Sequence, residues 1–69
     1  MPLTMMNPGE QFLIKKINGN EEARRFLENL GFVAGASGAV VSKLGGNLIV
    51  RIMDSRIAIS REMAQKIIV

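Results

Sequence analysis

The sequence contains no cysteine and no histidine. The chain therefore has no disulfides, and it lacks the thiolate and imidazole ligands that transition metals most often take. Oxygen ligands are scattered, apart from three on one predicted helix; the acidic residues are Glu10, Glu21, Glu22, Glu28, Asp54 and Glu62. We therefore expect no structural metal site and no other cofactor.

Long hydrophobic runs are also absent. No stretch approaches the roughly 20 apolar residues that cross a bilayer. The segment Met1–Gly9 has no basic start followed by an apolar run, so it does not resemble a signal peptide. A cysteine-free composition fits a reducing compartment. We expect a cytoplasmic protein with a single domain over residues 1–69.

No run of like charge and no catalytic motif is present. Nine Lys and Arg against six Asp and Glu give a net charge of +3. The basic residues are dispersed, without the interleaved aromatic rings that stack nucleic acid bases. Non-specific RNA or DNA binding by a small basic barrel is the alternative function. There is no Ser–His or Cys–His pairing and no phosphate-binding loop ending in Gly-Lys, so we do not expect an enzyme.

Aliphatic segments separated by glycine- and asparagine-rich turns predict short antiparallel strands. They are expected at residues 10–17, 36–43, 47–53, 56–59 and 67–69. In the strand at 47–53, Leu48, Val50 and Ile52 alternate with Ile49, Arg51 and Met53, so one set faces the core and the other the outer face. Turns are expected at Leu44-Gly45-Gly46 and at Asp54-Ser55.

The clearest helix is predicted at residues 21–30. One buried stripe at helical spacing is expected, made of Ala23, Phe26, Leu27 and Leu30. Asn18 or Asn20 can cap its start. Gly31 can end it in a left-handed conformation, which lets Phe32 pack back on Leu27. The pairs Glu21–Arg25 and Arg24–Glu28 are expected on its exposed face.

A second, shorter helix is expected from a Ser60 N-cap to about Lys66. The elements then alternate as strand, helix, three strands, short helix and strand. This order predicts a mainly β fold, a small SH3-like partly open barrel of about five antiparallel strands. The helix inserted after the first strand is expected to cover one open end.

Four segments, in order and over nearly the whole chain, resemble the FeoA family (ferrous iron transport protein A). They are Arg24–Gly35, Leu44–Val50, Asp54–Ile59 and Ser60–Val69. One departure is Ala34-Gly35, where the family usually has Pro-Gly. Alanine removes the restraint on φ and keeps the glycine, so only the rigidity of that turn differs.

The resemblance implies an SH3-like barrel and a cytosolic accessory role in ferrous iron uptake. Its implied partner is an FeoB-type transporter with a cytosolic G-protein domain, so the membrane is reached only through that transporter. Similar domains form the C-terminal part of some metal-dependent repressors, which makes a regulatory module the broader class. Because the implied partner has a G-protein domain, a further hypothesis is that an arginine of this chain acts in trans on the phosphate of a bound nucleotide. The candidates are Arg24, Arg25, Arg51, Arg56 and Arg61.

Two surfaces are candidates for protein binding. The first is the helix with its exit, and its residues are Arg24, Arg25, Leu27, Glu28 and Phe32. The second is the outer strand face, with Ile49 and Met53. A strand that is apolar on both faces needs cover for the second one. The cover is either the helix and N-terminal segment of the same chain, or a partner, or another copy in a homo-oligomer.

Overall fold

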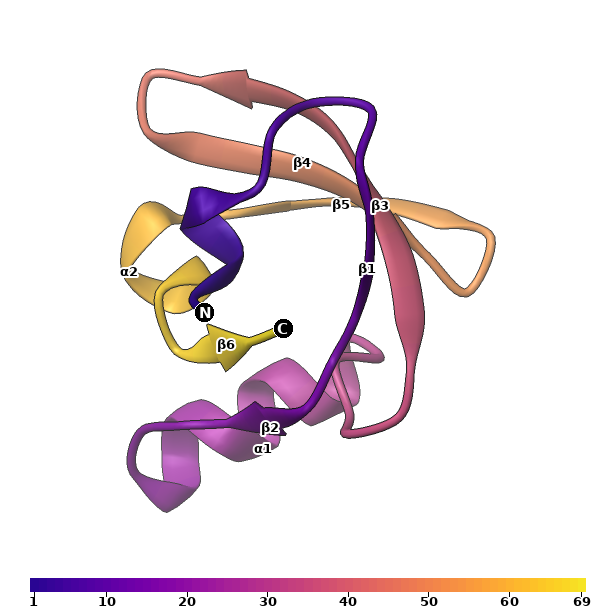
Figure 1. The fold of residues 1–69 in the computed structure, drawn as a ribbon. Helices are drawn as coiled ribbons and strands as arrows, with labels where there is room; N and C mark the ends of the chain where they lie inside the picture. The colour runs from indigo at the N-terminus through magenta and orange to yellow at the C-terminus, as the bar shows by residue number, and fades with distance from the viewer.

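The computed structural model describes residues 1–69 and contains two antiparallel sheets around one core (Figure 1). The larger sheet has the order β1-β3-β4-β5, and its strands are Gln11–Leu13, Ser37–Leu44, Asn47–Ile52 and Ser55–Ile59. The smaller sheet pairs β2 (Lys16–Ile17) with β6 (Ile67–Ile68). The helices are α1 (Glu21–Asn29) and α2 (Arg61–Ala64), and a 3-10 turn spans Leu3–Met5. The partly open arrangement is confirmed.

The single strand expected at residues 10–17 is wrong, because the chain changes sheets in its middle. The Ile14 N–H donates to the Ala36 carbonyl at 2.8 Å, in line with the pairing of β1 and β3. The next N–H, that of Lys15, donates to the Ile68 carbonyl at 2.7 Å, beside the pairing of β2 and β6. One continuous strand cannot bond to both sheets, so it splits into β1 and β2.

Helix α1 begins where the sequence predicts and ends one residue earlier, at Asn29. The Asn20 side chain accepts a hydrogen bond from the Ala23 N–H at 2.8 Å, which caps the first turn. At the other end Gly31 has φ +106°, and the Phe32 N–H donates to the Leu27 carbonyl at 2.9 Å. This exit turns the chain back and buries the Phe32 ring in the core.

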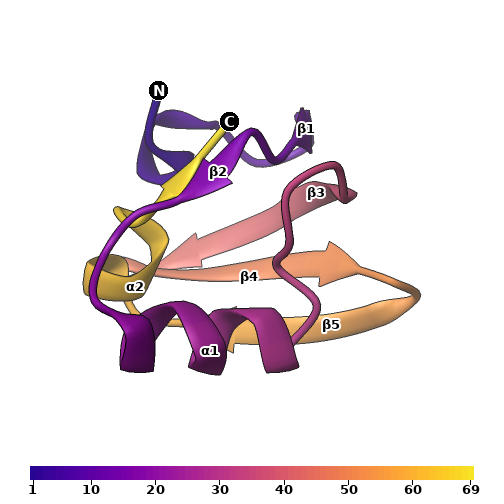
Figure 2. The ribbon, with the colours of Figure 1, turned by 90° about the horizontal axis from the view of Figure 1, so that it is seen from below.

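The buried stripe of α1 is narrower than expected. Leu27 is fully buried and Ala23 and Leu30 are partly buried, whereas Phe26 is 50% exposed. Figure 2 looks up at α1 from below, with β4 and β5 behind it, and Figure 1 shows the helix on the far side of the core from these strands. The helix therefore covers the open side of the sheet mainly through Leu27, and Phe26 lies outside the core.

The β4–β5 turn lies one residue earlier than predicted. Its central residues are Met53 and Asp54, with φ of 50° and 65°, instead of Asp54 and Ser55. Positive φ at both central positions is the geometry whose twist matches the flanking strands of a two-residue hairpin. Ile52 and Ser55 then face each other, and Met53 projects from the turn.

The alternation of β4 is confirmed. Leu48, Val50 and Ile52 are buried, and Ile49 and Arg51 lie on the outer face, which is the face of the larger sheet turned away from the core. A bulge in β3 between Val40 and Ser42 shifts its register against β4 and coils the sheet. The core is entirely apolar: Leu3, Met6, Phe12, Ile14, Leu27, Phe32, Val40, Leu48, Val50, Ile52, Ile59, Ala64 and Ile67.

The two ends of the described chain meet. Pro2 bridges to Ile68, and the Val69 N–H donates to the Met1 carbonyl at 2.8 Å. Ser60 caps α2 as expected, but the helix ends at Ala64 rather than near Lys66. Neither helix has the length and the apolar content that crossing a membrane would require.

Candidate interaction site

A groove of about 970 Å³ opens on the outer side of the larger sheet, beside the β4–β5 turn. We call it the outer groove. Its floor and walls come from β1, the segment before β3, β3, and the end of β4. Its lining is Gln11, Phe12, Leu13, Val33, Gly35, Ala36, Ser37, Gly38, Ala39, Arg51, Ile52, Met53 and Asp54.

The groove exists because the middle strand has almost no side-chain bulk at this end. Residues 34–39 read Ala-Gly-Ala-Ser-Gly-Ala. Gly38 shows only backbone to the groove, because a Cβ there would point to the core side, 2.5 Å from the Arg51 carbonyl oxygen and 2.8 Å from the buried Phe12 ring. Of the residues expected at a binding surface from the sequence, only Met53 lines this groove. The signal that could have revealed the rest is the run of six small residues at 34–39, which leads into the strand predicted at 36–43.

Three exposed apolar side chains rim the groove. Leu13 on β1 is 58% exposed, Val33 beyond α1 is 40% exposed, and Met53 in the β4–β5 turn is 74% exposed. Apolar side chains gathered at a hollow of this size are typical of a protein interaction site. Covering these side chains would stabilise a complex by on the order of 25 cal/mol for every Å² of apolar surface removed from water.

The structure brings together parts of the two candidate surfaces, the exit of α1 and Met53 of the outer strand face. The Met53 Sδ atom lies 3.0 Å from the point where a Cβ at Gly31 would stand. The exit of α1 and the β4–β5 turn therefore touch, and Val33 continues from that exit into the groove. Ile49 stays apart, because it pairs with Ser42 and Ala58 farther along the sheet and does not line the groove.

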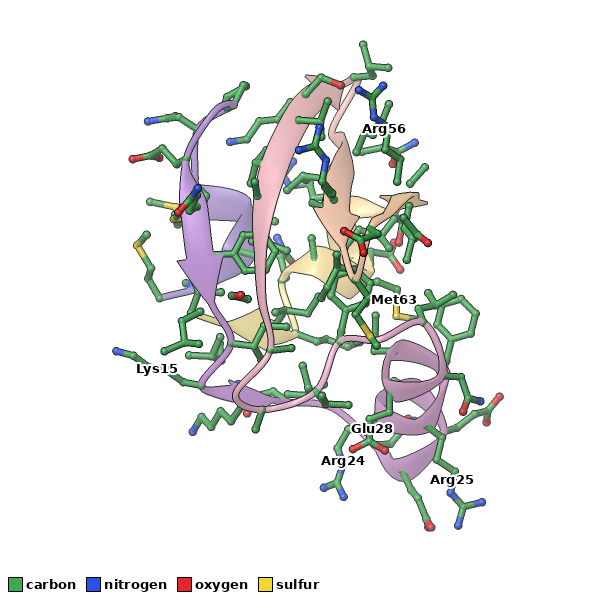
Figure 3. All side chains as sticks on the ribbon, turned by 90° about the vertical axis from the view of Figure 1, so that its right-hand side faces the viewer. Lys15, Arg24, Arg25, Glu28, Arg56 and Met63 are labelled. Atoms are coloured by element: carbon green, nitrogen blue, oxygen red, sulfur yellow. The ribbon has the colours of Figure 1, made fainter.

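The charged candidates on α1 remain at the surface. Figure 3 shows the side chains of Arg24, Arg25 and Glu28 projecting from the helix. The expected Arg25–Glu21 pair is confirmed, at 2.6 Å between Nη2 and Oε1. The expected Arg24–Glu28 pair is wrong, since Arg25–Glu21 is the one salt bridge in the structure. Exposed ion pairs contribute little to stability, so the presence of one pair and the absence of the other change the stability of α1 only slightly.

Two of the candidate contact residues are interior. The side chains of Leu27 and Phe32 are fully buried, because they anchor α1 and its exit in the core. They hold the surface in position and do not form it. The exposed side chains on this side of the molecule are those of Arg24, Arg25, Glu28 and the half-exposed Phe26.

The ionisable groups do not assemble into a chemical site. Three or more acidic side chains nowhere come together as a potential metal site. No charged or polar residue is buried. Of the five arginines considered for action on a phosphate, only Arg51 and Arg56 face each other across strands, and only Arg51 lines the outer groove.

Comparison with known proteins points to one family. A model described as the FeoA domain matches residues 1–69. A Methanocaldococcus jannaschii protein, named provisionally as Fe(2+) transport protein A, is 34% identical over 68 residues, which cover 99% of this chain and 83% of that protein. The crystal structure of an iron uptake regulatory protein (FeoA) superimposes with a TM-score of 0.90 at 28% identity, over 97% of this chain and 91% of the other.

The fold class is confirmed by a second solved structure. Stenotrophomonas maltophilia FeoA in complex with zinc, described as a prokaryotic SH3 domain protein, has a TM-score of 0.82 at 24% identity, over 99% of this chain and 87% of the other. A manganese-dependent transcriptional repressor shares the fold as well, with a TM-score of 0.88 at 17% identity, over 97% of this chain and 39% of the other. The structure is thus an SH3-like fold with open sheets.

Proposed function

The chain belongs to the FeoA domain family, and from that premise we propose that it is a cytoplasmic, non-enzymatic accessory protein of ferrous iron uptake. It acts by binding the cytosolic part of an FeoB-type iron transporter. The family name supports the process, and the partner is the one that the family resemblance implies. The observation that carries a binding role is the outer groove, with its exposed apolar rim of Leu13, Val33 and Met53.

The groove is already formed in the free chain and can bind part of a partner without rearrangement. Its floor is backbone and small side chains of a central strand, so it is rigid and already open. Little ordering of this chain is then needed on binding, which lowers the entropic cost of association. Arg51 and Asp54 at the β4 end add one charge of each sign beside the apolar rim.

Helix α1 extends the same surface. Its exit touches Met53, and its charged side chains Arg24, Arg25 and Glu28 lie on the exposed face of the helix. Interfaces commonly combine an apolar centre with a polar rim. We assign the centre to the groove and the rim to α1.

The test is a calorimetric titration of the chain with the purified cytosolic domain of the FeoB-type transporter from the same organism. The double variant Leu13→Lys, Met53→Lys places two charges on the apolar rim and is expected to weaken binding at least tenfold. Leu44→Lys is the matched control, because Leu44 is 61% exposed in β3 next to the β3–β4 turn and does not line the groove. It is expected to bind as the original chain does.

Two outcomes would count against the proposal in different ways. If the original chain does not bind the transporter domain, the proposed function fails. If it binds and a folded groove variant binds equally well, the function stands but the groove is not the contact. The charge reversal Arg24→Glu, Arg25→Glu then decides whether α1 alone forms the interface. Circular dichroism on each variant separates lost contact from lost fold.

A further inference from the structure

The larger sheet ends in a strand with an unpaired edge. β5 is the last strand in the order β1-β3-β4-β5, and its only strand partner is β4. Outside the pairing of β4 with β5, no backbone hydrogen bond begins or ends at residues 55–59. We call the free side of Ser55–Ile59 the β5 edge. It offers five residues of extended backbone, enough for a short additional strand.

The register of the hairpin determines which backbone groups point outward. In a hairpin with a two-residue turn, the residues flanking the turn exchange hydrogen bonds, and every second pair after them does the same. Ile52 and Ser55 flank this turn, and the register continues with Arg51 opposite Arg56. The N–H and C=O groups of Arg56 and Ala58 therefore face away from β4, toward the β5 edge.

The same register sets two positive charges side by side. Arg51 and Arg56 are directly opposite on the outer face, at a pair of the closely spaced kind. Like charges in this position destabilise a sheet. Neither guanidinium is in a salt bridge, since the one salt bridge of the structure is on α1. Figure 3 shows the Arg56 side chain on the side of the sheet turned away from α1.

A second copy of the chain is a poor occupant of this edge. Antiparallel pairing of two β5 strands about Ile57 would set Arg56 of each chain opposite Ala58 of the other. Both Arg51–Arg56 pairs would then lie on one face of the joined sheet, with four positive charges close together. Charged residues on edge strands oppose self-association in this way. The repulsion becomes attraction when the incoming strand carries carboxylates.

We propose that the β5 edge binds an extended acidic segment of another protein by strand addition. Backbone groups of Arg56 and Ala58 would form the ladder, and a carboxylate of the incoming segment would face Arg51 and Arg56 on the outer face. This interaction goes beyond the proposed function, because it uses the backbone edge of β5, which meets the outer groove only at Arg51, and does not require the partner to be a transporter.

The probe is a synthetic peptide, acetyl-Thr-Val-Glu-Val-Glu-Val-Thr-amide, which alternates carboxylates with apolar residues at strand spacing. A matched peptide carries lysine in place of each glutamate. Binding is followed by nuclear magnetic resonance on the isotopically labelled chain. The glutamate peptide is expected to shift the amides of Arg56 and Ala58 saturably and to slow their hydrogen exchange. The lysine peptide is expected to bind at least tenfold more weakly.

Three variants test the two parts of the proposal. Arg56→Glu is expected to lower the affinity for the glutamate peptide at least tenfold and to raise the affinity for the lysine peptide. A merely structural role of Arg56 would not produce this reversal. Ala58→Pro removes an outward N–H without touching the ladder to β4, so it is expected to abolish binding of the glutamate peptide. Ala58→Ser keeps the N–H and is its control. If Ala58→Pro fails to fold, the charge reversal carries the test alone.

Several results would overturn the proposal. Equal binding of both peptides would remove the charge recognition. Shifts confined to Leu13 and Met53 would place the peptide in the outer groove. Another such result is that inorganic phosphate produces the same amide shifts, with neither phosphate nor the glutamate peptide slowing hydrogen exchange. That result would mean that Arg51 and Arg56 attract any anion and that no strand is added. Dimers of the original chain that Ala58→Pro disrupts would assign the edge to a second copy.

Discussion

At the scale of single residues, Gly38 decides how closely β3 packs against the core at the floor of the outer groove. It stands in β3 opposite Ile52 and next to Phe12 on β1. Its side of the strand is filled by the Phe12 ring, which leaves no room for a Cβ. Glycine is usually unfavourable within a strand, so its presence here marks a close approach between neighbours.

Gly38→Ala is therefore expected to destabilise the fold by about 1–3 kcal/mol, as overpacking of a well-filled core does. The added methyl group meets a backbone carbonyl and an aromatic ring, and the ring cannot move without disturbing the core. Urea unfolding gives the free energy directly. Ser37→Ala, at the exposed neighbouring position, is the control and should change stability by no more than about 0.5 kcal/mol. A neutral Gly38→Ala would show that Phe12 has freedom that the structure does not suggest.

At the scale of elements, α1 is held to the molecule by few side chains. Leu27 is its one fully buried residue, with Ala23 and Leu30 partly buried. The rest of its surface is charged or, at Phe26, half exposed. A nine-residue helix is marginal by itself in water, so its order depends on this narrow contact.

Leu27→Ala is expected to cost about 2–5 kcal/mol, the range for emptying a buried leucine site. Phe26→Ala removes a larger side chain and is nevertheless expected to cost less, because half of that ring already meets solvent. Thermal unfolding of both variants, followed by circular dichroism, ranks them. A larger loss for Phe26→Ala would mean that the ring packs on Met63 more firmly than the exposed hollow between α1 and α2 indicates.

At the scale of the whole molecule, the excess positive charge is spread out instead of gathered. The unpaired guanidinium groups of Arg51 and Arg56 lie on the outer face of the sheet, whereas Arg24 lies on α1. No tyrosine or tryptophan is available for stacking on bases, and two of the three phenylalanines are buried. A charge distribution of this kind favours short-range recognition of acidic partners over tracking of a polyanion.

Nucleic acid is accordingly expected to bind weakly and without sequence preference. Affinity for duplex DNA or single-stranded RNA should fall steeply between about 50 and 200 mM salt, since only phosphate contacts are available. Fluorescence anisotropy with labelled oligonucleotides of several sequences measures both the affinity and its salt slope. A sequence-preferring complex that survives physiological salt would make the RNA- or DNA-binding alternative the better function.

The sequence by itself determined the elements whose signals are local. The Asn20 cap, the Gly31 exit and the alternation of β4 each depend on residues within a few positions of one another. Capping, helical spacing and period-two alternation depend only on the local segment, so the folded structure retains them whatever the distant contacts are. The family resemblance also rested on such local segments.

Only the tertiary structure decided where distant segments meet. The split of residues 10–17 follows from two different partners, Ala36 and Ile68, far along the chain. The depth of the outer groove depends on β1 and β4 flanking a small-residue strand, and the Arg51–Arg56 pair depends on a turn placed one residue earlier than its sequence suggested. Pairing and register are set by the packing of the whole core, because a one-residue shift would turn buried side chains outward.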